Sequence, residues 1–128
     1  MSESKGGGLA ELLQEFQDDT GIDSGLAIIS RDGLIMRSLS LPSGIDEDIV
    51  AANAARILFL GEATGKELNK GELQQVLFQF ENGFVALAGA GPYAAVMALI
   101  TPENKLETGA ILFSIGILAR RVKKLLSG

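Results

Sequence analysis

The chain lacks the two side chains that carry most nucleophilic and acid–base chemistry, because it contains no histidine and no cysteine. It therefore has no imidazole base, no thiolate nucleophile, no disulfide and no thiolate or imidazole ligand for zinc. Any catalytic pair chosen among its 16 carboxylates would be arbitrary, because spacing singles out no pair. We expect no catalytic residue, no metal site and no cofactor, and we do not expect an enzyme.

Three short motifs resemble ligand sites but fail on spacing. Gly61 and Gly65 suggest a nucleotide phosphate loop, yet only three residues separate them, and Glu67 stands where a hydroxyl must reach magnesium. Residues 89–91 (Gly-Ala-Gly) resemble the start of a glycine-rich phosphate loop, but they lack its third glycine and the helix that must follow it. Residues 46–48 are all acidic, but they lack the spacing of a calcium loop and suit the positive end of a helix dipole.

Composition indicates one folded globular domain, with 128 residues, of which 47% are hydrophobic and 21% charged. The chain has no tryptophan and a net charge of −5, which argues against nucleic acid and anionic membrane surfaces as partners. Residues 1–8 are polar and glycine-rich, which predicts a flexible lead and no signal peptide. We expect a single domain over residues 9–128 and a cytoplasmic location.

Charge is distributed unevenly along the chain. Residues 1–64 hold four basic and eleven acidic side chains, whereas residues 65–128 hold seven basic and five acidic ones. The basic surplus lies at the end, as Arg120, Arg121, Lys123 and Lys124. Such cations complement the dipole at the end of a helix, and the alternative is a basic docking patch.

Apolar spacing predicts the secondary structure in the order α-β-β-α-β-β-β-α. An uncharged stretch over residues 83–102 is broken by Gly89, Gly91 and Pro92, so we expect two short buried strands there and no insertion into a membrane. The fold class is therefore α+β, a five-stranded, mainly antiparallel sheet with helices on both faces. The predicted helices cover residues 9–21, 45–62 and 106–126, and the strands cover residues 25–31, 34–39, 73–80, 84–88 and 94–100.

The second helix carries the most information about partners. Its apolar arc is wider than one buried face requires, so we expect one contact with the sheet and another with the helix of a second copy. The small residues suit the close approach of two helices, so the predicted dimer contacts are Ala51, Ala54, Ala55 and Leu58. Asn53 and Arg56 form the only polar strip, beside Leu60. Arg56 is either a solvated arginine or a residue that faces a partner.

Several segments together resemble one known family. They are a strand–Asp–Gly–apolar hairpin at residues 28–35, an alanine-rich helix at 50–55, a hairpin at 80–84, the Gly-Ala-Gly turn at 89–91 leading into residues 94–100, and a helix opened by Leu106 and Gly109. In this order and spacing, the chain resembles the roadblock/LC7 domain from about Leu9 to Leu126. It looks most like a stand-alone bacterial or archaeal member.

The resemblance implies a dimer with itself or with a related roadblock subunit, in which third strands pair about a twofold axis and second helices lie side by side. For the third strand, the implied contacts are Leu73, Gln75, Leu77 and Gln79. The resemblance also implies a small Ras-like GTPase as partner, with activation by reshaping the GTPase rather than by a catalytic arginine. Since Asn53, Arg56 and Leu60 lie on the exposed strip of the second helix, we predict that they are its contacts. The alternative is a scaffold or adaptor subunit, binding through Phe113 and Ile117 or the basic C-terminus.

Overall fold

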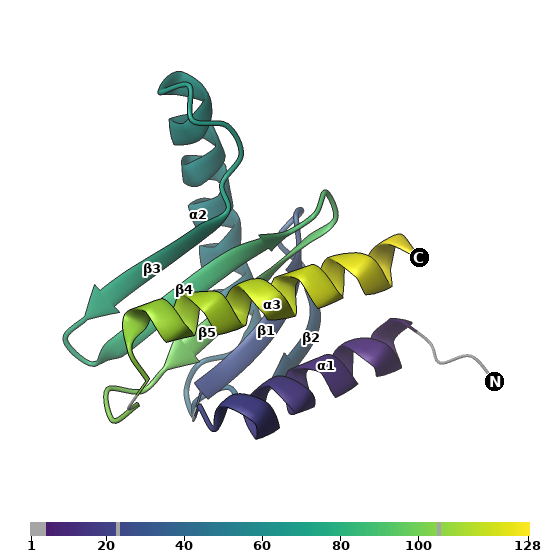
Figure 1. Cartoon of the computed structure of the whole chain (residues 1–128), viewed down its shortest axis with the longest axis vertical. Helices are drawn as coiled ribbons and strands as arrows, with labels where there is room; N and C mark the ends of the chain where they lie inside the picture. Colours follow the sequence, from purple (N-terminus) through teal and green to yellow (C-terminus); the bar gives the residue numbers. More distant parts are fainter. Residues whose placement is uncertain (1–4, 23, 105) are drawn as a thin grey trace.

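The computed structural model describes residues 5–22, 24–104 and 106–128, and it confirms the predicted order of elements (Figure 1). The helices are α1 (Lys5–Thr20), α2 (Glu47–Glu67) and α3 (Thr108–Ser127). The strands are β1 (Ser24–Ser30), β2 (Ile35–Leu39), β3 (Gln75–Phe80), β4 (Gly83–Ala90) and β5 (Ala94–Ile100).

The five strands form one sheet in the order β2-β1-β5-β4-β3, and every neighbouring pair is antiparallel. The central strands β1 and β5 are buried on both faces, as their continuous apolar sequences predict. The two edges differ. Pairing of β2 with β1 skips Met36, which makes a β-bulge, whereas β3 pairs with β4 without interruption from Gln75 to Phe80.

Helices cover both faces of the sheet, which confirms the predicted fold class (Figure 1). On one face α1 and α3 lie side by side and bury Leu13 and Ile115 against β1, β4 and β5. On the other face α2 alone packs on the sheet, through side chains that include Ala54 and Leu58. Its C-terminal part extends beyond the sheet (Figure 1).

The helix boundaries differ from the prediction most at the start of α1 and the end of α2. Helix α1 begins at Lys5, so residues 5–8 are helical rather than part of a flexible lead, and residues 1–4 lie outside the described residues. Helix α2 begins after Asp46, whose side chain accepts a hydrogen bond from the Ile49 amide at 2.9 Å. It continues to Glu67, five residues beyond the predicted end, so both Gly61 and Gly65 lie inside a helix. No helix in the described ranges is long and apolar enough to cross a membrane.

Candidate partner-binding face

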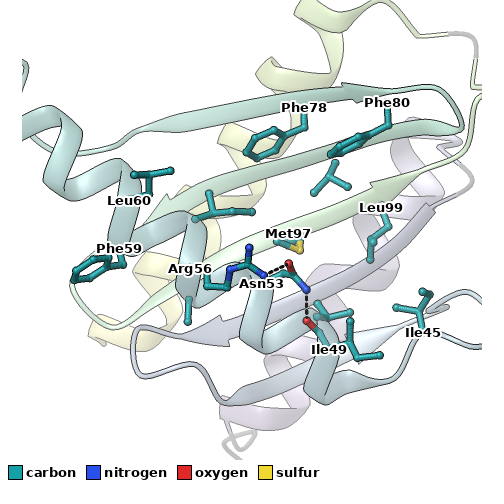
Figure 2. Close-up of a pocket in the computed structure, with 14 residues that line it drawn as sticks. Ile45, Ile49, Asn53, Arg56, Phe59, Leu60, Phe78, Phe80, Met97 and Leu99 are labelled. Carbon is teal, nitrogen blue, oxygen red and sulfur yellow. Dashed lines mark hydrogen bonds between the residues drawn. The ribbon is translucent and has the colours of Figure 1, made fainter.

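An apolar groove of about 870 Å³ lies between α2 and the uncovered half of the sheet (Figure 2). We call it the α2–β3 groove. Helix α2 forms one wall, and residues of β3, β4 and β5 form the floor. The principal lining residues are Ile45, Ile49, Asn53, Arg56, Leu60, Phe78, Phe80, Val85 and Leu99.

The groove exists because one helix covers a face that is wide enough for two. Helix α2 packs closest to β1 and β2, which leaves the end of β3 on that face poorly covered, with Phe78 half-buried and Phe80 exposed. Phe80 is 57% exposed, and its ring stacks on that of Phe78 at a centroid distance of 5.9 Å. On the helix, Phe59 and Leu60 are 80% and 68% exposed. Monomeric proteins rarely expose apolar patches of this kind, so this surface suits a protein partner.

The structure brings together the three residues that we predicted to bind a partner. Asn53, Arg56 and Leu60 all line the α2–β3 groove, and all three are exposed (Figure 2). Asn53 donates a hydrogen bond to the Ile49 carbonyl at 2.9 Å, and Arg56 donates to the Asn53 side-chain oxygen at 3.4 Å. The guanidinium of Arg56 has no ion pair within the described ranges, so its charge remains available.

The prediction for the small residues of α2 is wrong for three of the four. Ala51, Ala54 and Leu58 are buried in contact with the chain's own sheet, together with Val50. They cannot contact a second copy while this packing holds. The wide apolar arc does comprise two surfaces, but Ala51 and Ala54 pack with Val50 and Leu58 on the chain's own sheet, whereas Ile49, Phe59 and Leu60 are exposed. Ala55 is half-buried and lines the groove.

The outward surface of α2 and the floor of the groove contain residues that the sequence reasoning did not select. They are Ile49, Phe59, Phe78 and Phe80, and all four line the groove. A signal for two of them was present, because Phe78 and Phe80 alternate with Gln79 and so share one face of their strand. That spacing could not show whether a helix of the same chain covers this face.

The residues predicted for the third strand lie at an open edge of the sheet, because β3 has a neighbour only in β4 within the described part of the chain. Gln75 and Gln79 are exposed, and the Gln75 amide donates to the Leu112 carbonyl of α3 at 2.7 Å. Leu77 packs on the α1–α3 side of the sheet. Leu73 does not share that face, because it precedes the strand and packs on the α2 side instead.

A hydrogen-bond network fixes the entry into β3. Glu62 of α2 accepts from the Leu73 amide at 2.9 Å and forms an ion pair with Arg31 at 3.1 Å. Arg31 also donates to the Gly91 carbonyl at 3.2 and 2.9 Å. The network joins residues that are 31 and 60 positions apart in sequence, which is why sequence spacing did not reveal it.

The glycines that resemble a phosphate loop have a structural role. A Cβ on Gly61 would come within 2.6 Å of the Leu73 side chain, and one on Gly65 would overlap the carbonyl oxygen of Gly71. The Gly65 carbonyl also accepts from Lys70 at 2.7 Å as the chain turns back toward β3. Among the described residues, no group of three acidic side chains is placed to hold a metal ion.

Replacing Gly65 by alanine is expected to lower the free energy of unfolding. In most helices this change stabilises a protein by about 0.5–1 kcal/mol, because it restricts the unfolded chain. Here the added Cβ overlaps the Gly71 carbonyl, so we expect a net loss of about 1–3 kcal/mol. Urea denaturation followed by circular dichroism measures it.

Gly109 provides the matched control. It lies in the first turn of α3, and a Cβ there has no atom within 4 Å. Gly109→Ala should therefore stabilise the protein by up to about 1 kcal/mol. If Gly65→Ala stabilised the protein as much as Gly109→Ala does, the close approach of Gly65 to Gly71 would not exist in solution.

Comparison with known proteins agrees with this architecture. A family model described as Roadblock/LC7 domain matches residues 9–101. An uncharacterized protein of Methanocaldococcus jannaschii is 28% identical over 112 residues, which cover 88% of this chain and 94% of that protein.

Solved structures share the fold at low sequence identity. The gliding protein MglB of Thermus thermophilus has a TM-score of 0.84 and is 18% identical, with 99% of this chain and 94% of that chain covered. MglB of Myxococcus xanthus has a TM-score of 0.85 at 12% identity, with 99% and 93% covered. At these identities, the likeness establishes the fold.

Proposed function

Since this chain belongs to the roadblock/LC7 domain family, we propose that it is a non-enzymatic, dimeric regulator that binds a small Ras-like GTPase and modulates its cycle, as a GTPase-activating protein does. The observation that carries the proposal is the α2–β3 groove, a large apolar surface bordered by one unpaired arginine. Similarity to MglB structures, one of which has a tetrameric arrangement, supports self-association.

The proposed dimer uses the open half of the sheet. A second copy supplies its own α2 to cover Phe78 and Phe80, and its β3 pairs with the free edge of the first β3. Both surfaces lie at the same end of the sheet, so one twofold axis satisfies them together. The exposed apolar side chains of α2, chiefly Ile49 and Leu60, then pack between the two helices. This proposal moves Leu60 from the predicted GTPase contact to the dimer contact.

We place the GTPase contact on the side of the paired helices that faces away from the sheets. Residues two positions apart on an α-helix differ by about 200° in direction. Arg56, two residues after Ala54, therefore lies nearly opposite the buried side of α2 that Ala54 marks. Arg56 also lines the α2–β3 groove, so in this proposal the GTPase contacts it where the groove opens beside the second helix. We propose, as the family resemblance implies, that the GTPase supplies the catalytic groups and that the dimer holds its switch regions in place, with Arg56 contributing to binding.

Arg56→Glu is expected to weaken GTPase binding about tenfold or more without dissociating the dimer, because an interfacial arginine is lost and a like charge is introduced. The dissociation constant for the purified GTPase, loaded with a non-hydrolysable GTP analogue, measures this effect. Arg37→Glu makes the same charge change on exposed β2 at the opposite edge of the sheet. It should leave binding within about twofold. Equal losses in the two variants would contradict the assignment of Arg56.

The partner is identified by affinity capture from source lysate, once with excess GDP and once with the GTP analogue. Retention of a Ras-like protein mainly with the analogue supports a regulator, and stimulated GTP hydrolysis by the purified pair supports activation. Equal retention in both conditions, or capture of other proteins alone, favours a scaffold or adaptor instead. That second candidate rests on Phe113, which is 65% exposed on α3, far from the groove.

A further inference from the structure

A second depression, of about 530 Å³, lies where α3 meets the start of β3 and the turn between β4 and β5. We call it the basic cleft. Its lining is mainly polar and contains three cationic side chains. Arg31 comes from the end of β1, and Arg120 and Lys123 come from one face of α3, three residues apart. One acidic residue, Glu72, also lines it.

The helix dipole does not explain these cations. Its effect falls off within the last turn of a helix, and Lys124 is the only basic residue in the last turn of α3. Arg120 and Lys123 precede that turn, and their side chains form no hydrogen bond or ion pair with the described residues. Arg121, on another face of α3, is paired with Glu15 at 3.7 Å. Arg120 and Lys123 are therefore two exposed cations on one face of α3 that are available to a ligand.

Glycines give the basic cleft its shape. A Cβ on Gly91 would come within 2.8 Å of the Lys123 side chain, and one on Gly116 would come within 2.6 Å of the Gln75 amide. An alanine at Gly91 would push the Lys123 side chain aside, and one at Gly116 would push the end of the Gln75 side chain aside. The third cation is held rigidly, because Arg31 donates two hydrogen bonds to the Gly91 carbonyl at 3.2 and 2.9 Å. The cleft thus combines one cation that is held in place, Arg31, with two exposed ones, Arg120 and Lys123.

We propose that the basic cleft binds an acidic peptide segment of a partner protein. A concave cleft cannot lie flat on a membrane, and the net charge of −5 opposes a long polyanion such as nucleic acid. No aromatic side chain lines the cleft, so a nucleotide base has nothing on which to stack. Arg120 and Lys123 are neighbours on the surface of the helix at about 5–6 Å between Cβ atoms. This separation suits two carboxylates of one peptide.

This site is independent of the proposed GTPase contact. The basic cleft borders α3, whereas the α2–β3 groove lies on the face of the sheet that α2 covers. The two share no lining residue. The cleft does share Leu73 and Gln75 with the predicted pairing of the third strands, but its cations Arg120 and Lys123 lie on α3. Failure of the GTPase assignment therefore leaves this one standing.

The test measures binding of a fluorescently labelled hexaglutamate peptide by anisotropy at ~10 mM ionic strength, where screening is weak. Arg120→Glu/Lys123→Glu should raise the dissociation constant about tenfold or more, because each lost pair and each new repulsion contributes up to about a factor of five. Arg121→Glu/Lys124→Glu is the matched control, since it changes the net charge equally on the same helix but outside the cleft. It should change the constant no more than about twofold.

Equal weakening by both double variants would show attraction to overall charge and would overturn the proposal, as would the absence of binding to the unaltered protein. Amide NMR gives a second readout that does not depend on variants. Addition of the peptide should shift the resonances of Gly89, Gly91 and Gly116, which line the cleft. Those of Gly21 and Gly44, which lie elsewhere in open positions, should stay in place. Shifts that are as large at Gly21 and Gly44 would also overturn it.

Discussion

Replacing Phe80 by aspartate is expected to convert the proposed dimer into monomers at micromolar concentration. Phe80 lies at the end of edge strand β3 and is 57% exposed until a second copy covers it. Burying such a ring stabilises a contact by ~1.5–3 kcal/mol, and the twofold axis makes each substitution act twice. The dissociation constant should therefore rise by ~10²–10⁴-fold. Light scattering after size-exclusion chromatography should report a mass near 13.4 kDa.

Leu34→Asp is the control for this change. Leu34 is 66% exposed, but it precedes β2 at the opposite edge of the sheet. The Leu34→Asp variant should therefore keep the molar mass of a dimer. Circular dichroism should show that both variants remain folded, because neither residue belongs to the core. A Phe80→Asp variant that stays dimeric would move the interface away from the α2–β3 groove.

Replacing Ala54 by aspartate is expected to remove several kcal/mol from the free energy of unfolding. Ala54 is 0% exposed between α2 and its own sheet, among apolar neighbours that include Ile29 and Leu87. A carboxylate placed there has no partner and loses its hydration. Since a domain of this size has a total stability of about 5–15 kcal/mol, much of the protein should be unfolded at 37 °C or below. Thermal and urea denaturation measure the loss.

Ala52→Asp separates burial from helix propensity, because Ala52 lies on the same helix but is exposed. Both changes lose about 0.5–0.7 kcal/mol of helix propensity, so the difference between them reports the buried contact. Both are measured in the Phe80→Asp background, so that dissociation does not contribute. If Ala54→Asp cost no more than Ala52→Asp, Ala54 would face outward, and the original assignment of this residue to the dimer contact would be restored.

Local patterns were sufficient to predict the fold. The order of three helices and five strands follows from spacing that each segment displays by itself, such as the alternation in residues 75–80 and the uncharged run over residues 83–102. Antiparallel pairing follows from short connections at Asp32-Gly33 and Asn82-Gly83. The largest displacements are at the start of α1 and the end of α2, with smaller ones at the starts of β3 and α3. Helix ends are hard to predict because they depend on contacts such as that between Gly65 and Gly71.

The face that each apolar side chain contacts was harder to predict. Helical spacing grouped Ala54 and Leu58 correctly, but it did not decide between the chain's own sheet and a second copy. That decision depends on how much of the sheet α2 covers, which is a tertiary property. The Arg31–Glu62 ion pair and the basic cleft were out of reach for the same reason, because each joins segments that lie far apart in the sequence.

The unequal edges of the sheet set a limit on how the protein can assemble. The bulge at Met36 and the charge of Arg37 make β2 a poor template for another strand, whereas β3 has neither a bulge nor a charged residue. A copy with only one edge strand that can pair joins one other copy through that strand, and the strand is then no longer free. In the proposed dimer, the ten-stranded sheet would end in β2 on both sides, so the sheet would not grow further. Removing the bulge and Arg37 together would leave β2 able to pair with another strand, and such dimers could then add to one another edge to edge and form fibres.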